Sequence, residues 1–261
     1  MNVMELFDLS GKTAVVTGGY TGIGRQMALG LAEAGADVVI SARNLDGCVQ
    51  TAREINELTG VRALPVKCDV SKPGDVRNMV GETVSKFGKI DVLVNNAGIA
   101  VGALPHEMSD EDWESILSVN LTGTFLCCRE AGKEMIKAGS GKIINVSSIM
   151  GYQTTRLVSA PSYVASKGGV IALTKDLAVR WIPHNINVNA LAPGWFPTNM
   201  TEPVLSPEFM DKGKEMLDSI PAGRFGGGDD LKGAVVLLAS RASDYMVGEV
   251  LVIDGGATSR Y

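Results

Sequence analysis

The chain has 261 residues, of which 45% are hydrophobic and 20% charged, and its formal net charge at pH 7 is -5. This composition supplies the apolar side chains of a large core and excludes a disordered chain. The negative charge provides no long-range attraction for nucleic acid or an anionic membrane, so neither is expected as a partner.

The N-terminus carries Glu5 and Asp8, where a signal peptide needs basic and then apolar residues. Downstream, short β-branched runs predict strands at residues 12–17, 37–41, 62–67, 90–94, 142–146, 186–191 and 250–253. Apolar residues at helical spacing predict helices at residues 23–34, 45–59, 73–87, roughly 110–137, 161–182 and 230–238. Gly60 and Gly88 end the second and third helices, and Ser109 is the expected N-cap of the fourth.

The predicted strands are continuous apolar runs, which indicates burial on both faces and hence a parallel sheet with helices above and below it. Repeated strand–helix units give a doubly wound α/β fold. We see no linker and no internal repeat, so we expect one domain over residues 1–261, with an excursion at about 195–221. No run of 18 apolar residues is present, and a cytoplasmic protein is expected.

The four cysteines and two histidines predict no metal site. The cysteines form no CxxC pair, and His106 and His184 stand far apart. We expect reduced thiols used as small buried side chains.

A glycine-rich turn, TGGYTGIG at residues 17–24, joins the first strand to the first helix. Gly18 allows the tight turn, Gly22 allows close backbone approach, and Gly24 lets the helix pack on the strand. The free N–H groups of the first helical turn then face a pyrophosphate. The alternative is a glycine-rich turn without a ligand, but the position directly after the first strand favours a dinucleotide.

The second strand ends in SARN at residues 41–44, with no acidic residue to bind the 2′-hydroxyl of NAD. Arg43 can pair with a 2′-phosphate instead, which favours NADP(H), with NAD(H) as the second choice. Asp69, after the third strand, is expected to accept from the adenine amino group. The alternative for Arg43 is a surface arginine without a ligand. The alternative for Asp69 is an aspartate that caps a turn or a helix.

Tyr163 and Lys167 are four residues apart, so on a helix they share one face. A phenol has a pKa of about 10, and a nearby ammonium favours the phenolate, so we expect Lys167 to lower the pKa of Tyr163. The pair can then exchange a proton with a carbonyl or alcohol oxygen near neutral pH.

Taken together, the motifs resemble those of the short-chain dehydrogenase/reductase family, over essentially the whole chain. The chain carries, besides TGGYTGIG and YxxxK, the segments DV at 69–70, NNAG at 95–98, VSS at 146–148, PG at 193–194 and DGG at 254–256. The resemblance implies a Rossmann fold with one seven-stranded parallel sheet flanked by helices. It also implies a homotetramer.

The resemblance implies a catalytic group of Asn120, Ser148, Tyr163 and Lys167. Ser148 is chosen because Gly151 follows it at the family's spacing, which leaves Ser147 a structural role as the alternative. The cofactor is expected to contact Gly18, Tyr20, Thr21, Gly22, Ile23, Gly24, Arg43, Asp69, Val70, Asn96, Ala97, Gly98, Tyr163, Lys167, Pro193, Gly194 and Thr198.

In the mechanism that the resemblance implies, Ser148 stabilises negative charge on the substrate oxygen and Tyr163 exchanges its proton. Lys167 holds the nicotinamide ribose, and Asn120 anchors a water that carries protons to solvent. The expected activity is NAD(P)(H)-dependent interconversion of a carbonyl and a secondary alcohol.

Substrate choice is assigned to the loops at 99–107, 151–159 and 195–221. Similarity to gluconate 5-dehydrogenase-like members implies a keto-sugar acid, a polyol or a similar small ketone, and Arg156 is a candidate for binding a carboxylate. The alternative is a 3-oxoacyl-carrier-protein reductase, although Val179 stands where those enzymes have a docking arginine, with Arg180 beside it. A dinucleotide-binding regulator without catalysis is the remote alternative.

Overall fold

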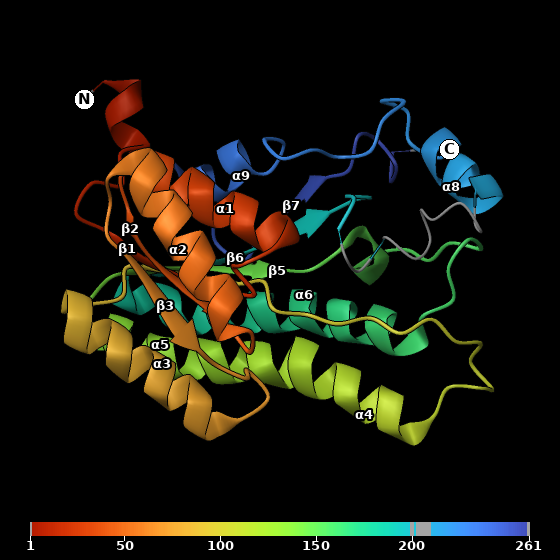
Figure 1. Cartoon of the computed structure of the whole chain (residues 1–261), viewed down its shortest axis with the longest axis horizontal. Helices are drawn as coiled ribbons and strands as arrows, with labels where there is room; N and C mark the ends of the chain where they lie inside the picture. The colour runs from red at the N-terminus through yellow and green to blue at the C-terminus, as the bar shows by residue number, and fades with distance from the viewer. Residues whose placement is uncertain (1, 199–200, 202–209, 260–261) are drawn as a thin grey trace.

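The computed structural model describes residues 2–198, 201 and 210–259. Within these ranges seven strands form one parallel sheet in the order β3-β2-β1-β4-β5-β6-β7 (Figure 1). The strands are β1 (Thr13–Thr17), β2 (Asp37–Ala42), β3 (Ala63–Lys67), β4 (Val92–Asn95), β5 (Gly141–Val146), β6 (Ile186–Pro193) and β7 (Val250–Ile253). The predicted seven-stranded parallel sheet is confirmed, with strand ends shifted by no more than two residues.

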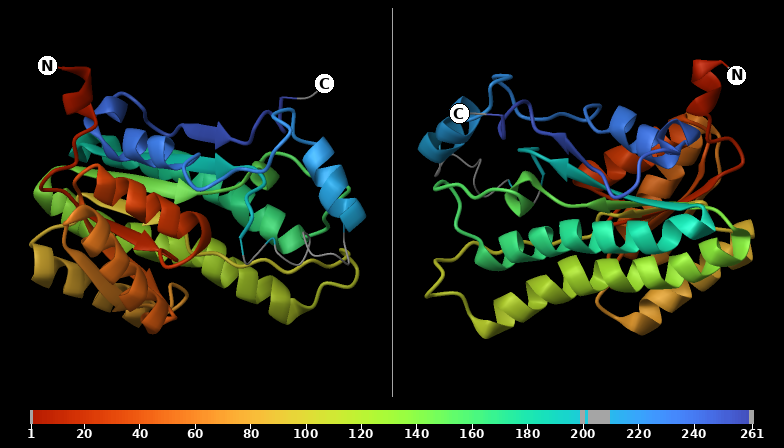
Figure 2. Two further views of the ribbon diagram at one scale, coloured as in Figure 1. Left: turned by 45° about the horizontal axis from the view of Figure 1, so that its top comes forward. Right: turned by 180° about the vertical axis from the view of Figure 1, so that it is seen from behind.

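Helices cover both faces of the sheet (Figure 2). One face packs against α1 (Gly22–Glu33), α2 (Leu45–Thr59) and α9 (Lys232–Ala239). The other packs against α3 (Pro73–Phe87), α5 (Gly123–Ala138) and α6 (Pro161–Trp181), and α4 (Asp110–Leu117) continues this second layer. A further helix, α8 (Met210–Asp218), lies beyond the carboxyl ends of the strands (Figure 1). No helix within the described ranges is both long and apolar enough to cross a membrane.

The central strands bury apolar side chains on both faces. In β1, Ala14 and Val16 belong to the core beneath α1, whereas Val15 belongs to the core beneath α3 and α5. Because successive side chains of a strand point to opposite faces, two apolar layers require a continuous apolar run. The expectation that every strand is buried on both faces is wrong for the two edge strands. In β3 only Val66 is buried, and all residues of β7 are half-buried. An edge strand has a neighbouring strand on one side only, which leaves part of its surface uncovered.

The long helix predicted at roughly 110–137 is two helices. Ser109 caps α4 as expected, accepting a hydrogen bond from the backbone N–H of Asp112. A π-helical turn, Ser118–Thr122, then separates α4 from α5. A π turn inserts an extra residue into the helical repeat without ending the helix, and here it places the side chain of Asn120 inward. The apolar spacing continues across the turn, so periodicity alone predicts one unbroken helix.

All four cysteines are free and buried, as the sequence predicts. Burial raises the pKa of the Cys48 thiol to about 11 and those of Cys68 and Cys128 to about 12. Burial likewise raises the pKa of the Cys127 thiol well above its ordinary value. None of these thiols is therefore ionised at neutral pH.

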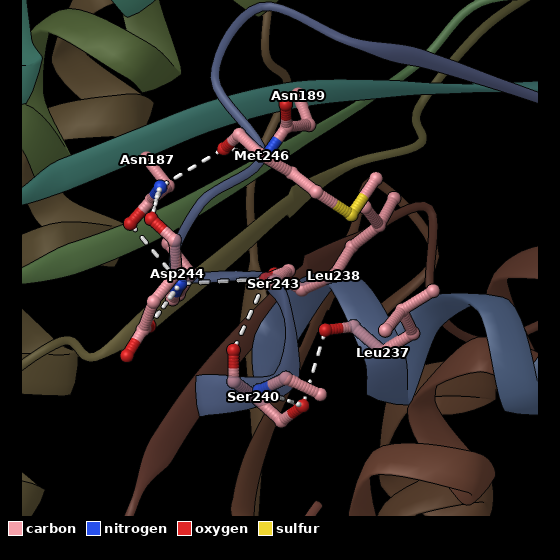
Figure 3. Close-up of polar contacts among 10 residues, drawn as sticks. Asn187, Asn189, Leu237, Leu238, Ser240, Ser243, Asp244 and Met246 are labelled. Atoms are coloured by element: carbon pink, nitrogen blue, oxygen red, sulfur yellow. Dashed lines mark hydrogen bonds and ion pairs between the residues drawn. The ribbon is translucent and has the colours of Figure 1, made fainter. Parts of the chain in front are cut away.

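A polar network ties the turn after α9 to the start of β6, at the end of the sheet away from α8 (Figure 3). Asn187 donates to the backbone carbonyls of Asp244 (3.0 Å) and Met246 (2.9 Å), and Asn189 donates to Met246 (3.0 Å). The Lys142 ammonium reaches Asn187 and Asp244 from β5. These bonds hold β7 in register with β6 from its beginning.

Candidate active site

A cleft of about 450 Å³ lies at the carboxyl ends of the strands, where β1 stands between β2 and β4 and the chain order reverses. Such a reversal opens a crevice, because the connections on its two sides run to opposite faces of the sheet. Every residue expected to contact the cofactor lines this cleft, as do Ser148, Tyr163 and Lys167. Asn120 does not line it; its neighbour Val119 does, and Asn120 lies behind that surface.

The glycine turn forms one wall of the cleft, and its shape depends on missing side chains. A Cβ on Gly24 would overlap the Gly18 carbonyl and the Asn96 amide, and one on Gly22 would stand 3.2 Å from the Thr198 methyl group. Asn96 donates its side-chain amide to the carbonyls of Thr17 (3.0 Å) and Gly18 (3.2 Å). The Asn96 side chain thereby joins the end of β4 to the glycine turn after β1. This keeps the backbone of the turn open toward the cleft, as the binding of a pyrophosphate requires.

Two strand ends form the part of the cleft expected to take the adenosine. Arg43 is exposed and follows β2, and Asp69 follows β3. Burial raises the pKa of Asp69, but hydrogen bonds from Ser71 and the charge of Arg43 outweigh it and leave that pKa below its ordinary value. Asp69 thus has the turn role that the sequence left open and also lines the cleft. The Ser41 hydroxyl, 1% exposed, lies beside the Cys68 thiol, and both residues line the cleft there.

Tyr163 and Lys167 lie on the first turns of α6, which begins at Pro161. The Lys167 nitrogen is 5.6 Å from the centre of the Tyr163 ring, and it donates a 2.7 Å hydrogen bond to the Val146 carbonyl at the end of β5. Its side chain is buried, and desolvation lowers the pKa of Lys167 to about 8.

The expectation that Lys167 lowers the pKa of Tyr163 is wrong in this structure. Burial raises the pKa of the phenol above its ordinary value, and a hydrogen bond with Ser148 offsets part of that rise. Removing the phenol from water disfavours its charged form. Tyr163 is consequently a protonated phenol at neutral pH.

Ser147 and Ser148 both line the cleft but make different contacts. Ser147 donates its hydroxyl to the backbone carbonyl of Lys167 at 2.9 Å, which attaches β5 to α6. The Ser148 oxygen accepts from the backbone N–H of Met150 at 3.1 Å, so its hydroxyl proton stays free to be donated toward Tyr163.

The side chain of Asn120 is hydrogen-bonded at both ends. Its oxygen accepts from the backbone N–H of Ile99 (2.9 Å), and its amide donates to the Ile99 carbonyl (2.9 Å) and to the Ser166 hydroxyl (3.1 Å). A Cβ on Gly98 would stand 3.3 Å from the Asn120 oxygen and 3.7 Å from the Lys167 nitrogen. The glycine therefore keeps a space between these two polar groups.

Pro193 ends β6 and Gly194 follows it, and the segment at 254–256 supports both residues from behind. Asp254 accepts hydrogen bonds from the backbone of Gly256 (2.9 Å) and Thr258 (2.7 Å), and a Cβ on Gly194 would stand 2.7 Å from the Asp254 backbone. The DGG motif is thus a buttress for the cleft rather than part of its lining.

The cleft also contains lining residues that were not expected to contact the cofactor or to act in catalysis, three of which (Ile99, Phe196 and Thr201) belong to the loops assigned to substrate choice. The full set is Ser41, Ala42, Asn44, Cys68, Ile99, Val119, Val146, Ser147, Phe196 and Thr201. Most of them adjoin a strand end or a recognised motif, so extending each motif by one residue finds them. No local pattern marks Phe196 or Thr201. Thr201 accepts from the Thr198 N–H and donates to the Phe196 carbonyl, which closes the turn that carries Thr198.

Comparisons with known proteins show which family this chain resembles. The family model described as short chain dehydrogenase matches residues 12–208. The 2-dehydro-3-deoxy-D-gluconate 5-dehydrogenase of Escherichia coli K12 is 42% identical, over 99% of this chain and 100% of that protein. The 3-oxoacyl-[acyl-carrier-protein] reductase of Aquifex aeolicus is 41% identical, over 95% of this chain and 98% of that protein.

A solved structure with a similar fold is that of a gluconate 5-dehydrogenase from Burkholderia cenocepacia J2315 in complex with NADP and tartrate. It is 38% identical, covers 100% of both chains and has a TM-score of 0.93.

Lys167→Met tests the burial of the ammonium. The unfolded chain binds more protons at this site than the folded one between pH 8 and the ordinary lysine value of 10.5, so wild-type stability gains from rising pH in that window. Because methionine does not titrate, residue 167 contributes no such pH dependence to the stability of the variant. We expect the difference in free energy of unfolding, wild type minus variant, to rise by on the order of 2 kcal/mol from pH 7.5 to pH 10.

Urea denaturation at a series of pH values measures this difference. Lys175→Met, an exposed change on the same helix, controls for the loss of one positive charge. A difference for Lys167→Met that stays constant across the window would contradict the burial argument.

Proposed function

Because this chain belongs to the short chain dehydrogenase family, we propose that Tyr163 exchanges a proton with the substrate oxygen in its reaction. The protein is an NADP(H)-dependent oxidoreductase that interconverts a carbonyl and an alcohol. One observation carries the proposal: Ser148, Tyr163 and Lys167 face the same cleft as the glycine turn. The dinucleotide, when bound, supplies or accepts the hydride.

The protonation state of Tyr163 suits carbonyl reduction. Its phenol is neutral at pH 7 and has a proton to give as negative charge develops on the substrate oxygen. The hydroxyl of Ser148, held by the Met150 N–H, donates a second hydrogen bond to the same oxygen. The two hydroxyls lie side by side and position the carbonyl between them.

Lys167 and Asn120 are proposed to hold a water through which protons return to Tyr163. Lys167 uses one of its three N–H donors on Val146 and keeps two for a ribose hydroxyl and for a water. We place that water beside Gly98, between the Asn120 oxygen and the Lys167 nitrogen, both of which lie near the missing side chain of this glycine. Protons can then pass from solvent toward Tyr163 after each turnover.

Arg43 is proposed to select NADP(H) over NAD(H). It is exposed beside the adenosine part of the cleft, and a guanidinium pairs with a 2′-phosphate through two parallel hydrogen bonds. The Ser41 hydroxyl, buried at the same strand end, is a further group that suits the adenosine ribose.

We propose a keto-sugar acid as the substrate. The relatives named for gluconate and 2-dehydro-3-deoxygluconate support this, as does the tartrate bound to the Burkholderia protein, since tartrate is a hydroxy acid. Arg156 is exposed in the loop before α6 and is proposed to meet the substrate carboxylate. Part of the third loop named above, including Met200 and Phe209, lies outside the described residues.

The 3-oxoacyl-thioester alternative rests on the similarity to the Aquifex reductase. On α6, Val179 is 71% exposed where a docking arginine is expected, and Arg180 is held in an ion pair with Asp176 at 2.9 Å. No other arginine follows on that helix, so its surface offers little to an acidic carrier protein.

Steady-state kinetics with three carbonyl substrates separates these functions. We expect the highest kcat/KM with a keto-sugar acid and NADPH, a lower value with the neutral keto-sugar, and the lowest with a 3-oxoacyl thioester. A higher kcat/KM with the thioester would contradict the keto-sugar acid proposal and favour a 3-oxoacyl-carrier-protein reductase. Tight NADPH binding without turnover of any substrate would favour the non-catalytic regulator.

Tyr163→Phe tests the mechanism. Removing the hydroxyl deletes the proton donor, so kcat is expected to fall by roughly 10²–10⁴-fold, while NADPH binding stays within about 3-fold because the glycine turn is untouched. Stopped-flow turnover and NADPH fluorescence titration measure the two quantities. Tyr245→Phe, a fully exposed tyrosine that does not line the cleft, is the matched control and should retain full activity. Normal turnover in Tyr163→Phe would end the proposed mechanism.

We also propose that the chain is a single domain that works as a cytoplasmic homotetramer. Trp113 on α4, with Phe125 and Ile136 on α5, is about two-fifths exposed, and these large apolar side chains suit a helix-to-helix interface. The half-buried β7 offers a second surface. Light scattering at micromolar concentration should give about four times the 27.5 kDa chain mass. A monomeric mass would contradict the assembly.

A further inference from the structure

A line of buried polar side chains crosses the molecule beneath the cleft. Asn95 on β4 donates to Cys128 on α5 (3.1 Å) and to Asn145 on β5 (2.9 Å). Asn145 in turn donates to the Thr174 hydroxyl on α6 at 2.9 Å. All four side chains are at most 3% exposed. Nothing in the proposed mechanism uses them.

The hydrogen bond from Asn145 to Thr174 acts together with the bond from Ser147 to the Lys167 carbonyl described above. Asn145 is on β5 and Ser147 directly follows that strand, and the side chains of both residues point toward α6. Ser147 donates to the Lys167 carbonyl, and Asn145 donates to Thr174 seven residues later, on the same face of α6. Two directional contacts, two helical turns apart, fix both the position of α6 along β5 and its rotation about its own axis.

The bond to Thr174 has a defined direction. Thr174 donates its only hydroxyl proton to the Val170 carbonyl at 2.8 Å, so its oxygen is oriented to accept from Asn145. Apolar contacts between α6 and the sheet, such as those of Leu177 and Ala178, exclude water but specify no such register.

Stability alone is a poor reason for this arrangement. Burying an amide is unfavourable unless each polar atom is paired, and the Asn95 oxygen has no partner among the described residues. Apolar side chains of similar volume would fill the same space without that penalty. The polar line is therefore better explained by the geometry that it imposes.

We propose that Asn145 and Thr174 are positioning residues that set the register of α6 on β5, and thereby hold Tyr163 and Lys167 opposite Ser148. This inference rests on the proposed function, because the register matters only if the groups on α6 act on the substrate. Tyr163 and Lys167 lie on the turns of α6 that precede Thr174, so a slide or rotation of the helix moves both together.

Thr174→Val is the decisive variant, because valine keeps the shape and removes the hydroxyl. Thr83→Val on α3 is the matched control: Thr83 is also 0% exposed and also donates to the carbonyl four residues earlier (2.7 Å, to Met79), but it lies away from the cleft. Thr174→Ser keeps the hydroxyl and should restore the bond. A second pair tests the other partner: Asn145→Ala against Asn189→Ala, both buried asparagines on strands.

We expect Thr174→Val and Asn145→Ala to lower kcat by about 10-fold or more, since small misplacements of reacting groups are costly to rate. NADPH affinity should stay within about 3-fold. The isotope effect on kcat with NADPH deuterated at the nicotinamide C4 should increase, because hydride transfer becomes the slow step. Thr174→Ser should return kcat to within about 2-fold of wild type, and both control variants should keep their kcat and isotope effect.

The inference is overturned if Thr174→Val and Thr83→Val lose stability alike and both keep wild-type kcat, or if Thr174→Ser is as slow as Thr174→Val. Its failure differs from that of the proposed function. The latter fails if Tyr163→Phe turns over normally, whatever the behaviour of the Thr174 variants.

Discussion

The burial of one ammonium group is the constraint on which the site depends. Lys167 is enclosed, and the hydrogen bond that it makes is to a neutral backbone carbonyl, that of Val146. Within the part of the chain that the structure describes, no carboxylate pairs with this ammonium, and burial of the unpaired cation lowers the pKa of Lys167. The fold must therefore hold the amine in place by other means. It does so by attaching α6 to β5 through Ser147 and Asn145, on strands whose own positions are set by two apolar layers.

The two sides of the cleft are built differently. The wall formed by the glycine turn is fixed by backbone geometry and by Asn96, which leaves little freedom. On the opposite side, Ser148, Tyr163 and Lys167 come from the end of β5 and from α6. The loops beyond them are joined to each other. Ser159 accepts from the Ala103 N–H (3.0 Å) and donates to the Ala103 carbonyl (2.7 Å), linking the loop after β4 to the one that precedes α6. Folds of this kind typically bind a common cofactor on the rigid scaffold and select a variable substrate with their loops.

Most of the fold and of the site could be predicted from the sequence because both follow local rules. Apolar runs indicate buried strands, and glycines such as Gly60 and Gly88 end helices in the left-handed conformation that favours this residue. The π turn at Ser118–Thr122 could not be predicted, since one inserted residue scarcely changes the apolar spacing. The raised pKa of Tyr163 was missed for another reason. The sequence gives the distance to Lys167 along the helix, but not how far the phenol is removed from water. The polar line through Asn145 depends on contacts between four separate elements and has no local pattern.

The state of the cysteines has a practical consequence for spectroscopy. Thiolates, not thiols, react with alkylating reagents, and burial keeps the four sulfur atoms protonated as well as shielded. A single cysteine placed on the surface, for example in the loop that carries Arg156, would then be the one site that a maleimide dye labels in the folded protein. Fluorescence from such a dye would report loop motion during turnover without any background from the native residues.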